Sequence, residues 1–229
     1  MSTTLALTAP PAPGVFEGGS NVIAVLVLLI EFGMFRQALL RDQLRLYAAQ
    51  SAVISVLAVV VAAARSLPEL YALAVLSAAL KVVIVPVVVR RLLRGDDVEI
   101  AGSGALGPAT TVLLAIVVAA FGFFTMGALD IRSPVLPTTA LALSISVVLV
   151  SFVLMIVRRD VASQAIGFFS LENGVSLASL VVAAGMPLIL EVAFLFDLLV
   201  AVVVFAVLMR VHHGRAESLS TTGLTRLRG

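Results

Sequence analysis

Two consecutive apolar stretches decide the fold of this chain: VASQAIGFFSLENGVSLASLVVAA, residues 161–184, and MPLILEVAFLFDLLVAVVVFAVLM, residues 186–209. Each is long enough for a membrane-spanning helix, which needs about 20 mostly apolar residues. Each also carries a carboxylate near its middle, Glu172 in the first and Asp197 in the second. A charged side chain at the bilayer centre costs between about 2.5 and well over 10 kcal/mol. The pair therefore predicts a function that moves charge, and protons above all, through the membrane.

The composition excludes a soluble protein. Of the 229 residues, 61% are hydrophobic and 12% are charged, whereas a soluble domain has about 25% charged residues. The absence of cysteine excludes iron–sulfur clusters and disulfides within this chain, and we expect neither a cofactor nor a metal site. Residues 1–20 contain no Lys or Arg, so we expect no cleavable signal peptide and an uncleaved first helix.

The apolar pattern predicts an all-α integral membrane protein with seven transmembrane helices, at about residues 21–40, 44–64, 68–93, 106–129, 135–157, 161–184 and 186–209. Prolines near helix starts, as in Leu67-Pro68, Arg132-Ser133-Pro134 and Gly185-Met186-Pro187, fit these boundaries. With seven spans, only Arg65 and Arg132 lie on one side. The other twelve arginines lie on the opposite side: Arg36, Arg41, Arg45, Arg90, Arg91, Arg94, Arg158, Arg159, Arg210, Arg215, Arg226 and Arg228. The positive-inside rule then places the N-terminus outside and the C-terminus inside. We expect the chain to lie in the cell inner membrane.

The first three and last three spans resemble each other. Pro68 and Pro187 each open a third span, and an arginine, Arg91 or Arg210, follows each by 23 residues. Gln50-Ser51 also lies at a position similar to Glu172-Asn173. We expect two parallel three-helix units joined by the fourth span. The expected segments are a polar tail (1–20), helices 1–3 with a loop (21–105), linking helix 4 (106–134), helices 5–7 (135–213) and a basic tail (214–229).

A rise of 1.5 Å per residue gives the depth of each ionisable group. Asp197 lies about 16 Å, Glu172 about 18 Å and Lys81 about 20 Å from the same surface, which places all three near one level. Glu31 lies slightly nearer the inside and Glu191 nearer the outside. We expect Glu172 to be the central proton carrier and Asp197 its neighbour, with Lys81, Glu191 and Glu31 tuning or extending the path. A static structural role is the alternative for each group.

A polar stripe accompanies Glu172 along its helix, which we expect to hold water and in which we include the neighbouring Asn173: Gln164, Asn173, Ser176 and Ser179. Gly167 and Gly174 predict a close approach of another helix.

Three other motifs give weaker signals. The glycine pattern at 102–107 follows no strand, so it indicates a loop and not a dinucleotide site. His212-His213 has no acidic or cysteine partners for a metal. The charged run 94–99 indicates a solvated loop or a docking point for a partner.

The stretch Val157-Arg158-Arg159-Asp160, followed by Ala165-Ile166-Gly167 and Leu171-Glu172-Asn173-Gly174, resembles the K subunit of bacterial respiratory complex I. That subunit has three helices, an Arg-Arg-Asn turn, then a Glu and an Asn in its second helix. Its third helix has an acid some 13 residues before a basic end, as Asp197 precedes Arg210 here. Two departures are visible: Glu172 lies one helical turn later than the family's Glu, and Asp replaces Glu in the last span.

This resemblance covers about residues 138–213, and the whole chain resembles hydrogenase-4 component E. It implies a non-catalytic membrane subunit of a complex I-like complex. Implied partners are antiporter-like and quinone- or hydrogenase-anchoring membrane subunits, with cytoplasmic iron–sulfur and nickel–iron subunits. Three alternatives remain: a subunit of a multisubunit cation/proton antiporter, a free-standing small-solute transporter, and a purely structural anchor. The sequence does not distinguish protons from sodium ions.

Overall fold

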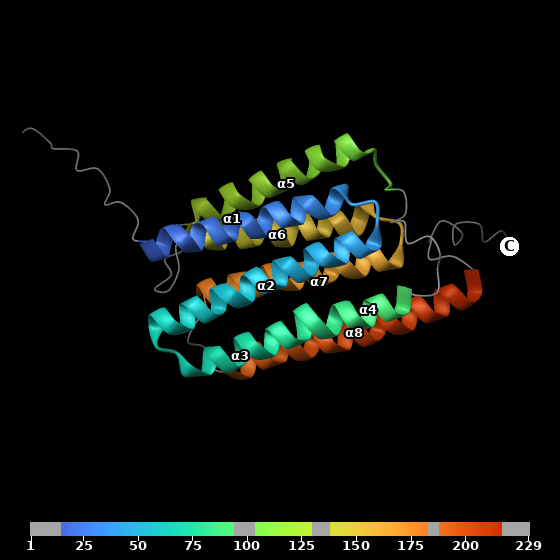
Figure 1. Cartoon of the computed structure of the whole chain (residues 1–229). Helices are drawn as coiled ribbons and strands as arrows, with labels where there is room; N and C mark the ends of the chain where they lie inside the picture. Colours follow the sequence, from blue (N-terminus) through green and yellow to red (C-terminus); the bar gives the residue numbers. More distant parts are fainter. Residues whose placement is uncertain (1–14, 94–103, 130–137, 183–187, 217–229) are drawn as a thin grey trace, which may run out of the picture.

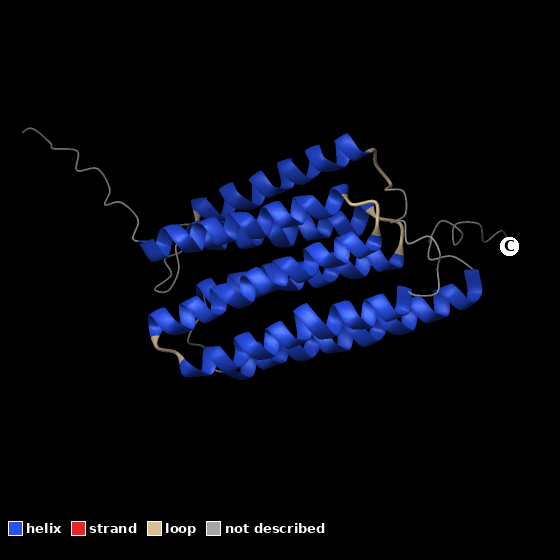
Figure 2. Ribbon diagram, viewed as in Figure 1, coloured by secondary structure: helices blue, strands red, loops and turns tan. Residues whose placement is uncertain are grey.

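The computed structural model describes residues 15–93, 104–129, 138–182 and 188–216 (Figure 1). All regular elements among these residues are helical (Figure 2). In chain order they are α1 (Val15–Arg36), α2 (Leu40–Arg65), α3 (Pro68–Ala78), the π-helix η1 (Ala79–Ile84), α4 (Val85–Leu92), α5 (Pro108–Ala128), α6 (Thr138–Val157), α7 (Val161–Val182) and α8 (Leu188–Ala216).

Six of the predicted spans are confirmed as helices long and apolar enough to cross a membrane, with α3, η1 and α4 forming one of them. The seventh is present as α8, in which the apolar stretch among the described residues is shorter, Leu195–Met209. The chain is therefore a multi-pass membrane protein. Its orientation stays a prediction. The predicted prolines at 134 and 187, the charged run 94–99, residues 102–103 of the glycine motif, and residues 1–14 and 217–229 of the predicted tails lie outside the described residues. The predicted tail bounds are wrong at their inner ends, because α1 already begins at Val15 and α8 continues to Ala216.

The first span ends earlier than predicted, at Arg36 and not at residue 40. The cause is a contact from the next helix. Gln43 Nε2 donates to the carbonyls of Met34 and Gln37, both at 3.3 Å, so its amide binds backbone oxygens at the end of α1. Those carbonyls need partners at a helix end, and the chain turns over residues 37–39 before α2 begins.

The turn between α6 and α7 is tied to this first turn. Arg158 Nη2 donates to the carbonyls of Phe35 at 2.8 Å and Gln37 at 3.2 Å. Asp160 caps α7, since its Oδ1 accepts from the backbone N–H of Ser163 at 2.6 Å. Burial lowers the pKa of Arg158, and the carboxylate of Asp160 opposes that shift. The Arg-Arg-Asp turn therefore locks the ends of two helix pairs together.

The helices stack in layers (Figure 1). α5 lies against α6 and α1; α1 contacts α6, α2 contacts α7, and α3 and α4 contact α8. The first three spans thus each contact the span that would be its counterpart in the second unit. This arrangement is compatible with two parallel units, and the internal repeat stays a prediction.

The predicted close approach at Gly167 and Gly174 is confirmed. A Cβ added at Gly174 would lie 2.8 Å from Val148 Cγ2 and 3.0 Å from the Val148 backbone nitrogen. At Gly167 it would lie 2.8 Å from Met155 Cγ. The two glycines bring α7 directly against the α6 backbone and so fix which face of α7 turns toward α1 and α2.

Candidate functional site

Glu31 on α1 is a carboxylate with no exposed surface. Three neutral side chains from three other helices donate to its carboxylate. Ser151 of α6 contacts Oε1 at 2.9 Å, Gln50 Nε2 of α2 contacts Oε2 at 2.9 Å, and Ser170 of α7 makes a short bond to Oε2. Since buried charge needs such donors, these helices form a complete shell around one carboxylate.

Ser170 has one hydroxyl hydrogen and two acceptors within reach. Besides Glu31 Oε2, its Oγ lies 2.8 Å from Gln50 Oε1. When Glu31 is ionised, the hydroxyl donates to it. When Glu31 carries a proton, that proton can be donated to Ser170 Oγ while the hydroxyl turns to Gln50. The geometry therefore supports both protonation states of Glu31.

Asn173 extends this cluster along α7. Its Nδ2 lies 2.9 Å from Gln50 Oε1 and 2.8 Å from Ser51 Oγ. Ser51 also neighbours the Tyr47 hydroxyl, and the Tyr47 ring packs on Phe169 with centroids 5.8 Å apart. Among the described residues, Tyr47 Oη and Asn173 Oδ1 are buried without a well-formed hydrogen bond. The cluster thus has spare hydrogen-bonding capacity on the side that leads to Glu172.

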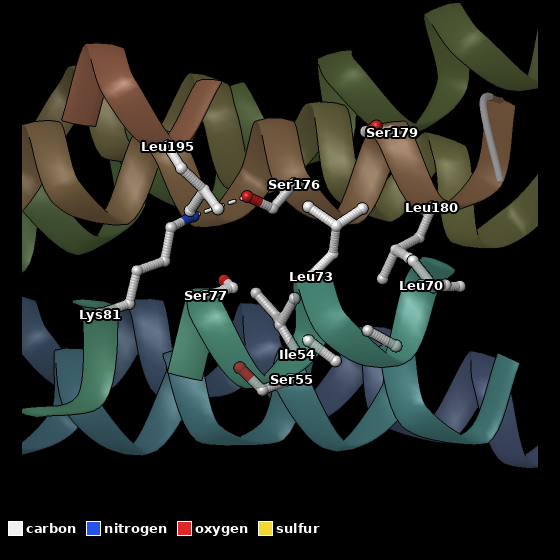
Figure 3. Close-up of a pocket in the computed structure, with 12 residues that line it drawn as sticks. Ile54, Ser55, Leu70, Leu73, Ser77, Lys81, Ser176, Ser179, Leu180 and Leu195 are labelled. Carbon is white, nitrogen blue, oxygen red and sulfur yellow. Dashed lines mark hydrogen bonds between the residues drawn. The ribbon is translucent and has the colours of Figure 1, made fainter. Parts of the chain in front are cut away.

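The second cluster surrounds Lys81, whose side chain is 3% exposed (Figure 3). Lys81 Nζ donates to Ser176 Oγ at 2.6 Å and to the backbone carbonyl of Glu172 at 3.2 Å. The charge of Lys81 attracts that of Glu172, while the charge of Asp197 repels that of Glu172. Lys81 and Glu172 therefore lie at one level, as the residue count predicts.

Lys81 lies in the π-helix η1, one turn before Pro86. Proline has no N–H to donate, and its ring clashes with the carbonyl four residues back. The helix widens there, and the N–H of Val85 bonds the carbonyl of Leu80 five residues earlier. Single π-turns are frequent at functional sites. Here the wide turn carries the buried lysine toward α7.

Together, the two clusters form a row of polar groups that runs across the bundle from α1 to η1. We refer to this set as the polar row: Glu31, Ser170, Gln50, Asn173, Glu172, Ser176 and Lys81. Its two parts meet at the adjacent residues Asn173 and Glu172 of α7. The row spans α1, α2, α7 and η1.

The remaining predicted residues lie outside the row. Asp197 is exposed on α8 and interacts with Glu172 only through its charge. The side chain of Glu191 lies outside the described set. Of the predicted stripe, Ser179 lines a cavity beside Lys81, and Gln164 Nε2 donates to the carbonyl of Arg158 at 2.9 Å, at the end of α6. Asn173 faces α2, a different direction from Ser176.

Sequence reasoning missed Ser151 and Ser170, and it used Gln50 only to argue for a repeat. A signal was present. Polar residues recur seven apart on three helices, as Gln43 and Gln50, Ser144 and Ser151, and Ser163 and Ser170. Seven residues make about two helical turns, so each pair shares one face. All six are buried, and a polar pair on one face of an apolar helix predicts a shared buried network.

Comparison with known proteins finds distant relatives. An uncharacterised protein of Mycobacterium tuberculosis is 37% identical over 75 residues, 33% of this chain and 34% of that protein. This chain thus matches about a third of its length. Hydrogenase-4 component E of Escherichia coli is 26% identical over 149 residues, 65% of this chain and 69% of that protein, and Shigella flexneri has a component E that matches equally. No family model and no solved structure matches.

Proposed function

We propose that this chain is a non-catalytic membrane subunit of a complex I-like oxidoreductase of the hydrogenase-4 type, and that its polar row carries protons. The observation that carries the proposal is the fully buried Glu31, linked by hydrogen bonds through α2 and α7 to the level of Lys81 and Glu172. The distant likeness to hydrogenase-4 component E supports the same assignment.

A purely structural role fits this geometry poorly. A static buried charge is normally neutralised by direct contact with its counter-charge. Within the described part of the chain, Glu31 and Lys81 instead bond to hydroxyl, amide and carbonyl groups, which serve charged and neutral forms alike. The arrangement therefore favours a change of protonation at both groups.

Within the proposed path, Glu31 accepts a proton on its carboxylate and Ser170 reorients to Gln50 as it does so. Glu172 and Lys81 together form the second proton-exchanging site, after Glu31. The charge of each residue alters the free energy of protonating the other. A proton arriving at Glu172 removes the attraction on Lys81 and favours loss of a proton from its ammonium group. The row thus couples two neighbouring sites.

The exposed face of α8 supports partner subunits in the membrane. Asp197 lies there among exposed apolar side chains that include Phe196, Val200 and Val203. A carboxylate facing lipid at this depth is costly. We infer that another membrane subunit covers this face and supplies a hydrogen-bond donor or a cation to Asp197, which would extend the polar row beyond this chain.

The direct test is proton uptake by the assembled complex in vesicles, with Glu31→Gln and Glu172→Gln in separate preparations. Glutamine keeps the size of the side chain and loses the ionisable proton. Each variant should assemble and lower the rate of proton uptake at least about a hundredfold, the lower end of the contribution of one acid–base group. Glu69→Gln, at the exposed start of α3, is the matched control and should leave uptake unchanged. Full uptake in both test variants would remove the polar row from the mechanism.

Copurification in mild detergent distinguishes this proposal from the alternatives. Iron–sulfur and nickel–iron subunits should accompany the tagged chain. Antiporter-like subunits without redox partners would favour the cation/proton antiporter. Solute transport by the purified chain alone would favour a free-standing transporter.

A further inference from the structure

A cavity of about 60 Å³ lies between α2, α3, α7 and α8 beside Lys81 (Figure 3). Its polar end is formed by Lys81, Ser176, Ser179, Ser77 and Ser55, and its remaining wall is apolar and includes Leu70, Leu73 and Leu180. One buried water needs about 10–15 Å³ of such space. The cavity is therefore large enough for a few water molecules.

Several polar groups that line the cavity lack protein partners. The ammonium group of Lys81 has three N–H donors, and its two acceptors among the described residues are Ser176 Oγ and the carbonyl of Glu172. The hydroxyls of Ser77 and Ser179 have no hydrogen-bond partner within the described ranges. Lys81 is buried and the two serines are partly buried. Polar groups in such positions that lack protein partners are normally satisfied by water.

The cavity is elongated along α3. It extends from Lys81 to Leu70, which lies two residues after Pro68, the first residue of α3. Eleven residues of helix correspond to about 16 Å, so the cavity reaches from the level of the polar row almost to the end of the bundle. Its far end is lined by apolar side chains, Leu70 among them.

We propose that this cavity holds water and gives protons access to Lys81 from the end of the bundle where α3 begins. A proton that leaves the Lys81 ammonium breaks one N–H bond and forms one O–H bond on the adjoining water, which passes a different proton onward. The Lys81 amine then takes up a proton from the row or from the cavity. The access role rests on the proposed function, whereas the presence of water does not.

The absence of cysteine from the sequence makes a direct test simple. Single variants Ser77→Cys and Ser179→Cys, in the assembled complex in vesicles, are treated with 2-aminoethyl methanethiosulfonate. This reagent modifies the thiolate, which forms only where water is present. We expect both cysteines to react, at least about tenfold faster than Ser163→Cys, a fully buried position elsewhere on α7.

Two further cysteine variants serve as controls. Val75→Cys lies on the exposed outer face of α3 and reports on lipid-facing thiols, which should stay unreactive. Glu69→Cys at the start of α3 should react at once and shows from which side the reagent arrives. Reaction of Ser77→Cys and Ser179→Cys no faster than Ser163→Cys would overturn the water-filled cavity.

Proton uptake by the modified complexes tests the access role. Labelling of Ser179→Cys should lower uptake at least about fivefold, since the adduct fills the space beside Lys81, and reduction of the adduct should restore it. Labelling that leaves uptake unchanged would overturn the access role. It would not affect the proposed function, which the Glu31→Gln and Glu172→Gln variants test independently.

Discussion

The hydroxyl of Ser170 on α7 donates to the carboxylate of Glu31 on α1, across 139 positions of sequence, while Gln50 Oε1 lies 2.8 Å from the same hydroxyl. Ser151 also donates to Glu31, at 2.9 Å, and has no second acceptor within the part of the chain that the structure describes. Two serines thus bind one carboxylate, and only Ser170 can exchange partners when the carboxylate changes its charge.

This difference predicts unequal effects of two otherwise similar substitutions. Ser170→Ala and Ser151→Ala should each destabilise the protein by about 1–3 kcal/mol, because each removes a donor to a buried carboxylate. Only Ser170→Ala should also lower proton uptake, because only this hydroxyl can exchange partners when Glu31 changes its charge. Thermal unfolding and uptake are measured on the same preparations. Equal loss of uptake in the two variants would contradict a role for the exchange of partners.

Pro86 gives a second prediction. In Pro86→Ala the new N–H can bond the carbonyl of residue 82, and the π-turn at 79–84 should relax to an α-helix. One residue of an α-helix corresponds to about 100° of rotation, so Lys81 should leave Ser176. Stability should be unchanged or higher, since the substitution restores a hydrogen bond, while proton uptake should fall. Pro68→Ala, at a helix start, is the control. Normal uptake in Pro86→Ala would show that the wide turn does not matter.

The sequence predicts the spans well and the site only in part, and the reason is physical. Apolar length and prolines determine where helices lie, so the start of α3 at Pro68 is predictable. A constant rise per residue gives depth, which correctly places Lys81 level with Glu172. Depth does not give rotation about the helix axis, because packing against neighbours sets it. For this reason the sequence did not predict that Asn173 bonds to α2 in the Glu31 cluster whereas Ser176 bonds to Lys81.

The sequence also did not predict that Glu31 is buried at the centre of a hydrogen-bonded cluster. A carboxylate five residues before Arg36 has the pattern of a group that could reach the interface or pair with that arginine. In the structure it is fully buried, because α2, α6 and α7 close around it with Gln50, Ser151 and Ser170. Each donor comes from a different helix. The seven-residue spacing of the polar pairs indicates which face of each helix is buried, but it does not link these faces to Glu31. Glu172 as the central carrier stays a prediction.

Asp197 gives a prediction about assembly. Asp197→Leu removes an exposed carboxylate from an apolar face, so the isolated chain should be as stable as before or more stable. If another subunit binds this face through Asp197, the same substitution should reduce the amount of partner that copurifies. Val200→Leu, one turn along the same helix and also exposed, is the control. Unchanged recovery of all partners in Asp197→Leu would place the interface elsewhere.

The close contact between α6 and α7 gives the last prediction, which tests the scaffold of the site. In Gly174→Ala the new Cβ meets the Val148 backbone nitrogen at 3.0 Å, and a backbone atom cannot move without its helix. In Gly167→Ala the nearest atom, Met155 Cγ at 2.8 Å, belongs to a flexible side chain. Gly174→Ala should therefore cost about 1–3 kcal/mol of stability and Gly167→Ala less. Gly127→Ala, with nothing within 4 Å, should be neutral or stabilising. Thermal unfolding of the three variants ranks their stabilities directly.

Gly174→Ala should also affect function. Because Asn173 and Glu172 lie next to Gly174 on α7, the displaced helix should weaken the link between the two clusters and lower proton uptake, whereas Gly127→Ala should not. An equal melting temperature for Gly174→Ala and Gly127→Ala would contradict the tight packing that holds the polar row in place.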